Sequence, residues 1–399
     1  MSPHTSRKSL ISEGMKPHGL GFLVDLPSAN ALGLGRIPGI EHIIRPYLNG
    51  RDLTSISRGI FIIDAFDYSA ESLAERFPSI YQHLIDYVKP EREQKAHSVD
   101  GRQYAVQWWL FGKTRKELRR GLHGLERYII TVKTAKFRNF QFLPIAALPD
   151  SKLIAIASDD ALHLGILSSR IHIIWSTITG SRLGVGDDPT YVISKSFAAF
   201  PFPTPTAAQA ARIRDLAEQL DAHRKRQQAD HPDLTLTGIY NVLVKLRTGA
   251  VLTVKEQVIH ANGLVAVLRQ LHDDLDAAVA AAYGWPVDLP DAELLTRLVA
   301  LNAKRAAEEK AGTVRWLRPA FQAPDEVKAI KHSWPKAVGE RLALLREVLH
   351  SGGTIGLTVE AVRKRIAGAK AADVAELLSA LEAMGHARSI EGNWLDMRN

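Results

Sequence analysis

Three pairs of adjacent carboxylates in this sequence are candidates for general acid–base catalysis, in which a positioned side chain gives or takes a proton. These pairs are Asp159/Asp160, Asp187/Asp188 and Asp273/Asp274. Neighbouring acids more often form turns or helix caps. The segment Glu308–Glu309–Lys310 resembles half of a nuclease metal site, but the helix predicted around it offers no partner Asp at a suitable spacing. We therefore assign catalysis to none of these carboxylates.

Histidine and cysteine could hold a metal or attack a substrate, and neither gives a site. His163 and His172 lie within apolar stretches, which favours core positions over metal ligation. The sequence has no cysteine, which excludes disulfides, thiolate zinc sites and cysteine nucleophiles. It also has no GxxxxGK[ST], HExxH or GxSxG motif. The sequence therefore predicts no catalytic residue and no metal ligand.

Lysine and arginine are concentrated in one segment. Residues 101–150 contain ten Lys and Arg against three Asp and Glu, which is +7 in a chain of net charge +8. Such a local excess is typical of a protein that binds a polyanion, for example nucleic acid. The alternative is a solvated basic face without a partner.

Short strands and helices must position these charges. Runs of β-branched and aromatic residues bounded by Gly, Pro or Asp predict strands. These runs are 59–66, 127–132, 140–148 and 152–157. Apolar residues at helical spacing predict one helix over 69–88, with Ser69 or Ser72 as its N-cap. We expect an α+β domain over residues 1–205.

The composition changes at 200–205, Phe-Pro-Phe-Pro-Thr-Pro. Three prolines in this stretch oppose a helix and predict a stiff, extended linker. Amphipathic helices are then expected over 211–228, 263–285 and 291–312. Residues 206–320 are therefore predicted to form an all-α helical domain.

Residues 336–399 are predicted to form a third unit. A helix that ends at 351–353 is followed by helices at 359–366 and 372–384, and by two short strands around 391–393. This order is that of a winged helix. The last of these helices carries acids and no Lys or Arg, so we expect packing or protein interaction rather than DNA reading.

The sequence has no apolar run of the roughly 20 residues that cross a bilayer. Its first residues, MSPHTSRKSLISEGMKPHG, are polar and lack the apolar core of a signal peptide. We therefore expect a cytoplasmic protein without a membrane partner.

Several stretches occur together in one order along the chain. They are RPYLNGRDL (45–53), FIID (61–64), HLIDYVKPEREQ (83–94), WWLFGKTRKELRRGL (108–122), YIITVKTAKFRNFQFL (128–143), LIAIASDDALHLGILSSRIHIIWS (153–176), LGVGDDPTY (183–191), FAAFPFP (197–203), IYNVL (239–243) and AVAAAYGWP (278–286). Up to FAAFPFP they resemble the target-recognition domain of MmeI-like type IIG/IIL DNA adenine methyltransferases of restriction–modification systems. The last two resemble the helical C-terminal domain of that family.

The resemblance implies DNA recognition without the catalytic step. Relatives bind S-adenosylmethionine in a Rossmann-like domain, and an NPPY or NPPF motif there holds the flipped adenine. This sequence contains no Asn-Pro-Pro. By the resemblance, the chain is expected to be the sequence-recognition part of an adenine-N6 methyltransferase that binds double-stranded DNA. It is then expected to hold no S-adenosylmethionine, to be inactive alone, and to need a methyltransferase catalytic subunit.

A base-flipping enzyme holds the duplex through phosphates and reads it through base edges. The cations expected to hold phosphates are Arg102, Lys113, Arg115, Lys116, Arg119, Arg120, Lys133, Lys136 and Arg138. Arg45, Asn49 and Arg51 surround a predicted tight turn and are further candidates, although Asn49 equally fits a turn cap.

The stretch around 184–191 is the best candidate for base reading. Arg182 could donate to guanine and Asp188 could accept from cytosine, with Thr190 beside them. A capped structural turn is an equal alternative. For the whole chain, two other interpretations stay open. One is a helical protein-interaction module or remnant without DNA binding, and the other is an enzyme with an unrecognised catalytic site.

Overall fold

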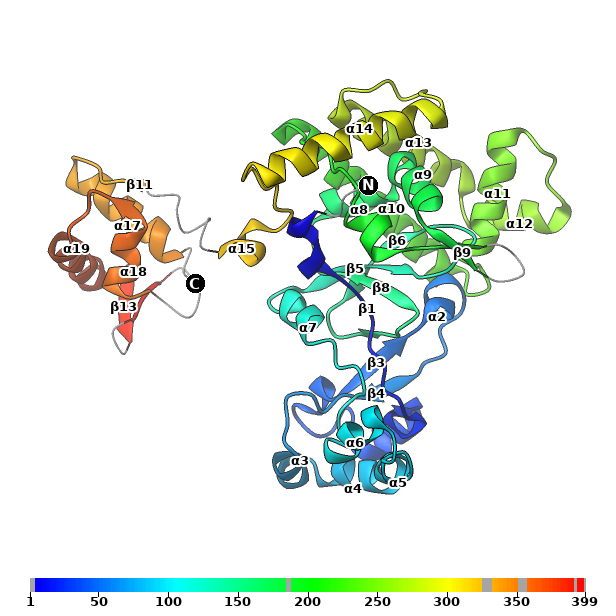
Figure 1. Cartoon of the computed structure of the whole chain (residues 1–399), viewed down its shortest axis with the longest axis horizontal. Helices are drawn as coiled ribbons and strands as arrows, with labels where there is room; N and C mark the ends of the chain where they lie inside the picture. Colours follow the sequence, from blue (N-terminus) through cyan, green and yellow to red (C-terminus); the bar gives the residue numbers. More distant parts are fainter. Residues whose placement is uncertain (1–3, 184–187, 325–331, 351–356, 391–392, 398–399) are drawn as a thin grey trace. The chain divides into compact units, whose positions relative to one another are not determined.

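The computed structural model describes residues 4–183, 188–324, 332–350, 357–390 and 393–397. They form two compact units, Met1–Arg315 (unit 1) and Trp316–Asn399 (unit 2). Unit 1 contains two four-stranded sheets with helices packed around them (Figure 1). This mixed α+β architecture agrees with the predicted fold class.

The first sheet is antiparallel, with the strand order β1-β8-β5-β6. Its strands are β1 (Ile11–Glu13), β5 (Arg127–Val132), β6 (Phe140–Pro144) and β8 (Leu153–Ile156). All four residues of β8 are buried, and its β-branched and aliphatic side chains suit such a position. Glu13 pairs with Ile154, which also pairs with Thr131 of β5. The sheet therefore brings the start of the chain to the basic segment.

The second sheet has the order β2-β4-β3-β7, in which β3 and β7 run parallel. Its strands are β2 (Leu23–Val24), β3 (Ile44–Leu48), β4 (Phe61–Ile63) and β7 (Leu148–Pro149). The helices of this part of the chain are α1 (Leu26–Leu32), α2 (Gly50–Thr54), α3 (Ala70–Arg76), α4 (Pro78–Tyr87), α5 (Lys89–Gln94), α6 (Val99–Val106) and α7 (Lys116–Leu122). Of these, α1, α2, α3, α4 and α7 contribute buried side chains to one apolar core that they share with the sheet.

The single helix predicted over 69–88 was wrong, because two helices occupy that range. Ser69 caps α3, whose C-cap is Phe77, and Pro78 then begins α4. A proline has no N–H to continue the helical ladder, and it disfavours helical geometry in the residue before it. Leu73 and Leu84 are nevertheless buried, as the apolar spacing predicted.

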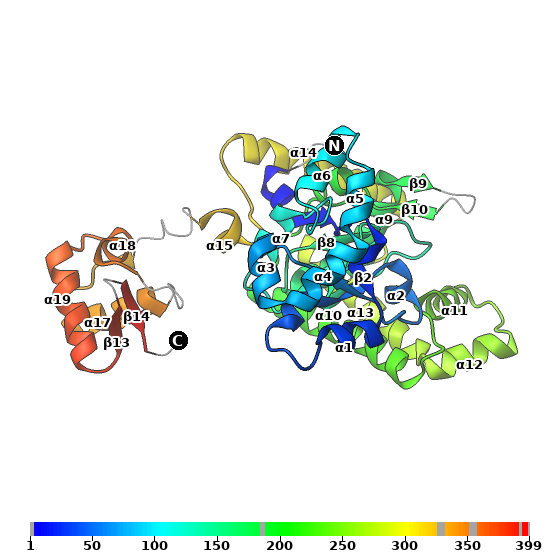
Figure 2. The same cartoon turned by 90° about the horizontal axis from the view of Figure 1, so that it is seen from below.

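Within the described part of unit 1, seven further helices follow the two sheets along the chain. They are α8 (Ala161–Ser168), α9 (Arg170–Thr179), α10 (Ala207–Asp230), α11 (Leu236–Thr248), α12 (Val254–Asn262), α13 (Val265–Tyr283) and α14 (Asp291–Lys310). Figures 1 and 2 both show α11 and α12 side by side at the edge of this unit. No helix in the described residues is long and apolar enough to cross a membrane.

The stretch at 200–205 is extended, as predicted, but it is not a solvated linker. Phe200 is 0% exposed and Phe202 is 5% exposed, and their rings lie 5.0 Å apart edge to face. Phe200 also lies 4.4 Å from the ring of His172. A capping box between Thr206 and Gln209 then begins α10. The predicted boundary at 205/206 therefore lies inside unit 1, and its status as a domain boundary stays a prediction.

Unit 2 has its own apolar core around Leu345, Val362 and Leu378. Its elements are α15 (Pro319–Gln322), β11 (His332–Ser333), α17 (Val338–His350), α18 (Val359–Lys364), β12 (Ile366–Ala367), α19 (Ala371–Ala383), β13 (Ala387–Ile390) and β14 (Asn393–Asp396). β13 and β14 are antiparallel. The predicted helix end at 351–353 and the predicted turn residues 391–392 lie outside the described residues.

We predict that Gly165→Ala destabilises unit 1 by about 1–3 kcal/mol, because a new methyl group overpacks the contact between α8 and α10. A Cβ at this position would lie 2.6 Å from Ile213 Cγ2 and 3.2 Å from Ala217 Cβ. Chemical denaturation followed by fluorescence measures the change. In the control Gly339→Ala the added Cβ meets no atom within 4 Å. An unchanged midpoint for Gly165→Ala would contradict this packing.

Candidate nucleic-acid interface

Glu13 at the end of β1 joins two cations that are far apart in the sequence. Its carboxylate lies 2.5 Å from Lys133 Nζ and 2.9 Å from Arg115 Nη2. Burial alone would raise the pKa of Glu13, but the hydrogen bond from Lys133 and the two positive charges lower it. Two cations therefore share one carboxylate, and a positive charge remains on this surface.

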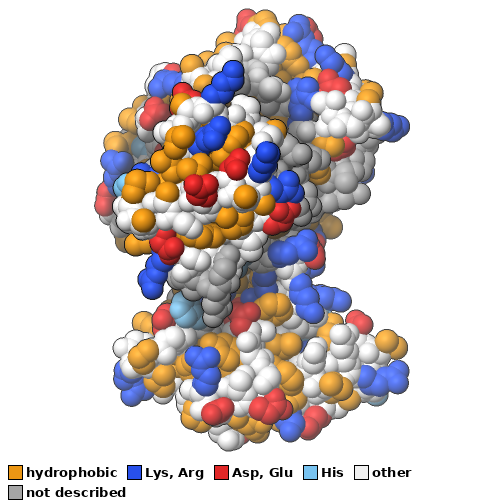
Figure 3. Space-filling view, turned by 90° about the vertical axis from the view of Figure 1, so that its left-hand side faces the viewer, with side chains coloured by type: hydrophobic (Ala, Val, Ile, Leu, Met, Phe, Trp, Pro, Cys, Tyr) orange, Lys and Arg blue, Asp and Glu red, His pale blue; other side chains and the backbone are white. Residues whose placement is uncertain are grey.

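Four predicted residues line one open cavity of about 830 Å³. They are Arg45, Lys116, Arg119 and Arg120. In Figure 3, Lys and Arg side chains gather in the narrow part of unit 1, at the height that β1 and α7 have in Figure 1. The structure therefore brings together residues of β3 and α7 that lie about 70 positions apart in the sequence.

Two lining residues of this cavity, Arg45 and Arg119, contact Asp64, which is 6% exposed. Arg119 donates to both Asp64 oxygens at 2.8 and 2.9 Å, and its guanidinium lies 4.3 Å from the ring centre of Phe66. Arg45 Nη1 lies 3.5 Å from Asp64, and Arg45 also donates to the carbonyls of Ile145 and Ala146. Arg45 and Arg119 are therefore held rigidly, whereas Lys116 and Arg120 are exposed at the rim.

A hairpin packs against the turn that follows β5. Its strands are β9 (Ser181–Leu183) and β10 (Asp188–Thr190), and the intervening 184–187 of the predicted base-reading stretch lie outside the described residues. The hydroxyls of Thr134 and Thr190 lie 2.9 Å apart, and the Tyr191 N–H donates to the Lys133 carbonyl at 2.7 Å. Thr190 is thus a buried anchor of the hairpin.

Arg182 and Asp188, the two candidate base readers, do not share a face of this hairpin. Arg182 is paired with Pro189, whereas Asp188 is paired with Leu183. Side chains of successive pairs alternate between the two faces of a ribbon. Arg182 and Leu183 are exposed. A DNA groove that receives one face of the hairpin therefore meets Arg182 or Asp188, and not both.

Arg138 and Lys136 are held by neighbouring protein groups. Arg138 donates to the carbonyls of Val132 and Pro189, the latter at 2.9 Å, and burial lowers its pKa to about 10. These contacts connect the turn after β5 to β10. Lys136 Nζ donates to Asn241 Oδ1 of α11 at 2.8 Å and is exposed. A phosphate contact by Arg138 would require these hydrogen bonds to break.

Four further candidates lie elsewhere on the surface. Asn49 is the N-cap of α2, where its side chain accepts from the N–H groups of Arg51 and Asp52. The side chains of Arg51, Arg102 and Lys113 are exposed and have no hydrogen bond or ion pair within the part of the chain that the structure describes.

The histidines that the sequence placed in the core are buried. His163 Nδ1 lies 2.7 Å from Ser158 Oγ, and His172 Nε2 lies 3.0 Å from Tyr191 Oη. Burial lowers the pKa of His172 to about 3, so the ring is neutral at physiological pH. The described residues include no group of three His, Asp or Glu arranged to hold a metal.

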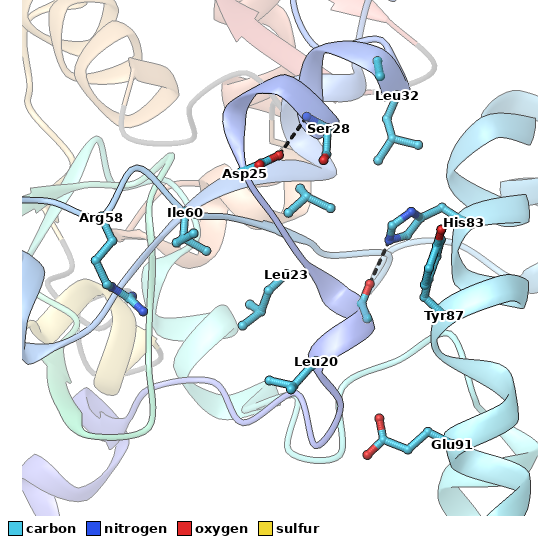
Figure 4. Close-up of a pocket in the computed structure, with 13 residues that line it drawn as sticks. Leu20, Leu23, Asp25, Ser28, Leu32, Arg58, Ile60, His83, Tyr87 and Glu91 are labelled. Atoms are coloured by element: carbon cyan, nitrogen blue, oxygen red, sulfur yellow. Dashed lines mark hydrogen bonds between the residues drawn. The ribbon is translucent and has the colours of Figure 1, made fainter.

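A second cavity, of about 810 Å³, lies between α1, β2 and α4 and includes none of the predicted residues (Figure 4). Its polar groups already have partners. Asp25 accepts from the Ser28 N–H at 2.9 Å, His83 Nε2 contacts the Gly21 carbonyl at 2.9 Å, and Glu91 pairs with Lys95 at 2.5 Å. The predicted residues therefore point to the surface around β1 and α7, not to this cavity.

A family model described as the MmeI target recognition domain matches residues 3–204. The chain belongs to this family. The match confirms the resemblance to MmeI-like proteins that we drew from the sequence, and all fifteen predicted contact residues lie within it.

A solved structure of the type IIL restriction–modification enzyme MmeI in complex with DNA is similar to this chain, with a TM-score of 0.55 and 18% sequence identity. The alignment covers 77% of this chain and 36% of that one, so the chain spans about a third of the MmeI chain. At this identity the likeness concerns the fold. No curated protein matches the chain.

Sequence reasoning missed Glu13 and Asp64, the acids that hold the cations of this basic surface. Glu13 lies more than a hundred residues before its partners, and Asp64 lies in a segment with excess negative charge. Because the charges were counted segment by segment, these acids were not considered together with the cations that they contact. The continuous apolar run of β4 (Phe61–Ile63) could have shown that Asp64, directly after a buried strand, is itself inside.

We predict that Asn49→Ala lowers stability by about 1 kcal/mol through loss of the N-cap of α2. Asn49→Ser should restore the stability, because serine caps a helix nearly as well. Thermal unfolding measures both variants, and duplex binding should stay unchanged in each. A loss of DNA affinity without a change in stability would instead identify Asn49 as a DNA contact.

We predict that Glu13→Gln destabilises the protein near neutral pH by less than about 1 kcal/mol, since the pair is partly exposed. The pKa of Glu13 is lower in the folded chain, so its ionised form adds stability above about pH 4.5. That contribution is lost as the pH falls through the lowered pKa. Unfolding curves of the two proteins should therefore converge in acid, and a constant difference across pH would contradict this assignment.

Proposed function

We propose that this chain is the DNA sequence-recognition part of an adenine-N6 methyltransferase of the restriction–modification type. The observation that carries the proposal is the family match over residues 3–204, which contains every predicted contact residue. The fold likeness to MmeI, which was solved in complex with DNA, supports duplex DNA as the partner.

The arrangement of cations supports a division between holding and reading the duplex. Lys116 and Arg120 line a cavity that Arg45 and Arg119 also line, and Lys133 and Arg115 share Glu13. Such a surface attracts phosphates irrespective of sequence. The exposed β9 strand is the element best placed to enter a groove, because its neighbour β10 is anchored by the buried Thr190.

We assign methyl transfer itself to a catalytic domain or subunit outside these 399 residues. S-adenosylmethionine carries a positive sulfonium. The first cavity is lined by four cations against two acids, Glu41 and Asp67, so its lining has a positive excess that would repel the sulfonium. The acids of the second cavity already have partners. These residues do not fit the cofactor, so no catalytic step is derived from them.

For unit 2 we propose a winged-helix-like fold with a role in packing or protein interaction. The order α17, α18, α19 and the β13–β14 ribbon supports the fold. Asp373, Glu376 and Glu382 of α19 support the role, because acids at a recognition helix would repel DNA phosphates.

The decisive experiment is selection from a random duplex library with the purified chain at two salt concentrations. We expect one enriched sequence motif and an affinity that falls steeply with salt, with a slope of about −0.9 per phosphate contact. Sequencing the retained DNA and measuring its affinity by fluorescence anisotropy give both results.

Two other outcomes would change the proposal. Binding without any enriched motif would contradict sequence recognition by this chain alone. No binding at low salt would contradict DNA recognition and favour a protein-interaction module or remnant. Methylation of DNA by the isolated chain would overturn the assignment of catalysis to another domain.

A further inference from the structure

Two lysines that are far apart in the sequence face each other directly at the surface. The Lys113 N–H donates to the Lys16 carbonyl at 3.0 Å, and the Lys16 N–H donates to the Lys113 carbonyl at 3.3 Å. In such an antiparallel pair the two side chains leave the backbone on the same face, about 5 Å apart at Cβ. Both lysines are exposed, and within the described residues neither ammonium has a hydrogen bond or ion pair. Like charges directly opposite each other destabilise a fold.

The backbone beside each lysine is strained in the same way. His18, two residues after Lys16, has φ +57°, and Arg115, two residues after Lys113, has φ +55°. Of the described non-glycine residues, only Leu264 also has a positive φ. Residues other than glycine rarely adopt this left-handed backbone conformation, and backbone strain of this kind concentrates at functional sites. The two strained residues fix the course of the chain on either side of the lysine pair.

A buried arginine holds the two lysine-bearing segments together. Arg92 is 2% exposed, and its Nη2 donates to the Pro17 carbonyl at 2.7 Å and to the Leu110 carbonyl at 3.1 Å. These two acceptors are neutral carbonyls, and Glu91 is the acid whose charge acts on Arg92. A buried cation beneath two exposed ones increases the positive potential at this point of the surface.

The imidazole of His18 lies within reach of these charges. Its ring centre is 5.4 Å from that of Tyr104. Burial is the largest effect that lowers the pKa of His18, followed by the charges of Lys16, Arg92 and Lys113, whereas Asp100 opposes them. Three cations therefore act on the imidazole of His18, and Asp100 opposes them.

We propose that Lys16 and Lys113 together bind one phosphodiester group of duplex DNA, on a platform made by Arg92 and His18. Two ammonium groups on one face can donate to the two unesterified oxygens of a single phosphate. The bound anion then removes the repulsion between the lysines. This inference rests on the proposed DNA-binding function, and it adds Lys16, which no motif in the sequence pointed to.

The test measures the salt dependence of binding to a mixed-sequence duplex for Lys16→Gln, Lys113→Gln and the double variant. The double variant should reduce the salt slope by about 0.9, because it removes one phosphate contact, which corresponds to roughly eightfold weaker binding at 0.1 M salt. Each single variant should give a smaller reduction, because the other lysine still contacts the same phosphate. The motif preference should not change, since a phosphate contact carries no base information. Lys16→Arg should retain the slope of the unchanged chain.

Lys255→Gln is the matched control, because Lys255 is also exposed and without a partner in the described residues, but lies on α12. It should leave the slope unchanged. A structural role for the lysines predicts a lower melting temperature for Lys16→Gln. If Lys16→Gln instead only removes the repulsion between the two lysines, its melting temperature should be equal to or higher than that of the unchanged chain.

The pKa of His18 gives an independent readout, followed by NMR and assigned with His18→Gln. A phosphate at Lys16 and Lys113 should raise this pKa when DNA is added, and the double variant should lose the rise. If the unchanged chain binds DNA and the double variant keeps its slope, the lysine site is wrong and the proposed function stands. If the unchanged chain does not bind DNA, both are wrong.

Discussion

The basic surface of unit 1 depends on the sharing of one carboxylate by two cations. Glu13 accepts from Arg115 and Lys133, and Asp64 accepts from Arg119 while Arg45 lies beside it. In both clusters the acid fixes the geometry of the cations and neutralises only half of their charge. A fully paired surface would be stable without a partner, and a fully unpaired one would repel itself. With half of the cationic charge neutralised, the surface stays positive and its cations stay in place, so a polyanion can neutralise the remaining charge.

The helices beyond residue 206 form part of the support for this surface. Arg224 of α10 donates to the Phe140 carbonyl of β6 at 2.6 Å and to Tyr240 Oη of α11 at 3.2 Å. Burial lowers the pKa of His272 to about 3, so its neutral Nε2 can accept from the Tyr240 hydroxyl at 2.9 Å. Because α11 also carries Asn241, the partner of Lys136, this buried network places a basic side chain near the hairpin.

The sequence predicted much of the local structure and little of the pairing between distant residues. β5 occupies the range predicted from its β-branched run, and Asn49 is the cap that its position beside Gly50 allowed. The break at Pro78 was also readable, because proline restricts the residue before it, but the apolar spacing outweighed it in our prediction. By contrast, the pairing of Glu13 with Lys133 depends on the order of strands in a sheet, which no local pattern contains.

The two strands of the β9–β10 hairpin differ in how well they should tolerate amino-acid substitutions. Thr190, Tyr191 and the Pro189 carbonyl hold β10 to the turn after β5, so substitutions there would disturb the core. All three residues of β9 are exposed and make no contribution to that core. Substitutions in β9 should therefore cost little stability. In the proposed function they would alter contacts to a DNA groove, while the cations held by Glu13 and Asp64 would continue to bind the phosphates. A recognition module needs this separation, because the sequence it reads must change more easily than the fold that presents the reading residues.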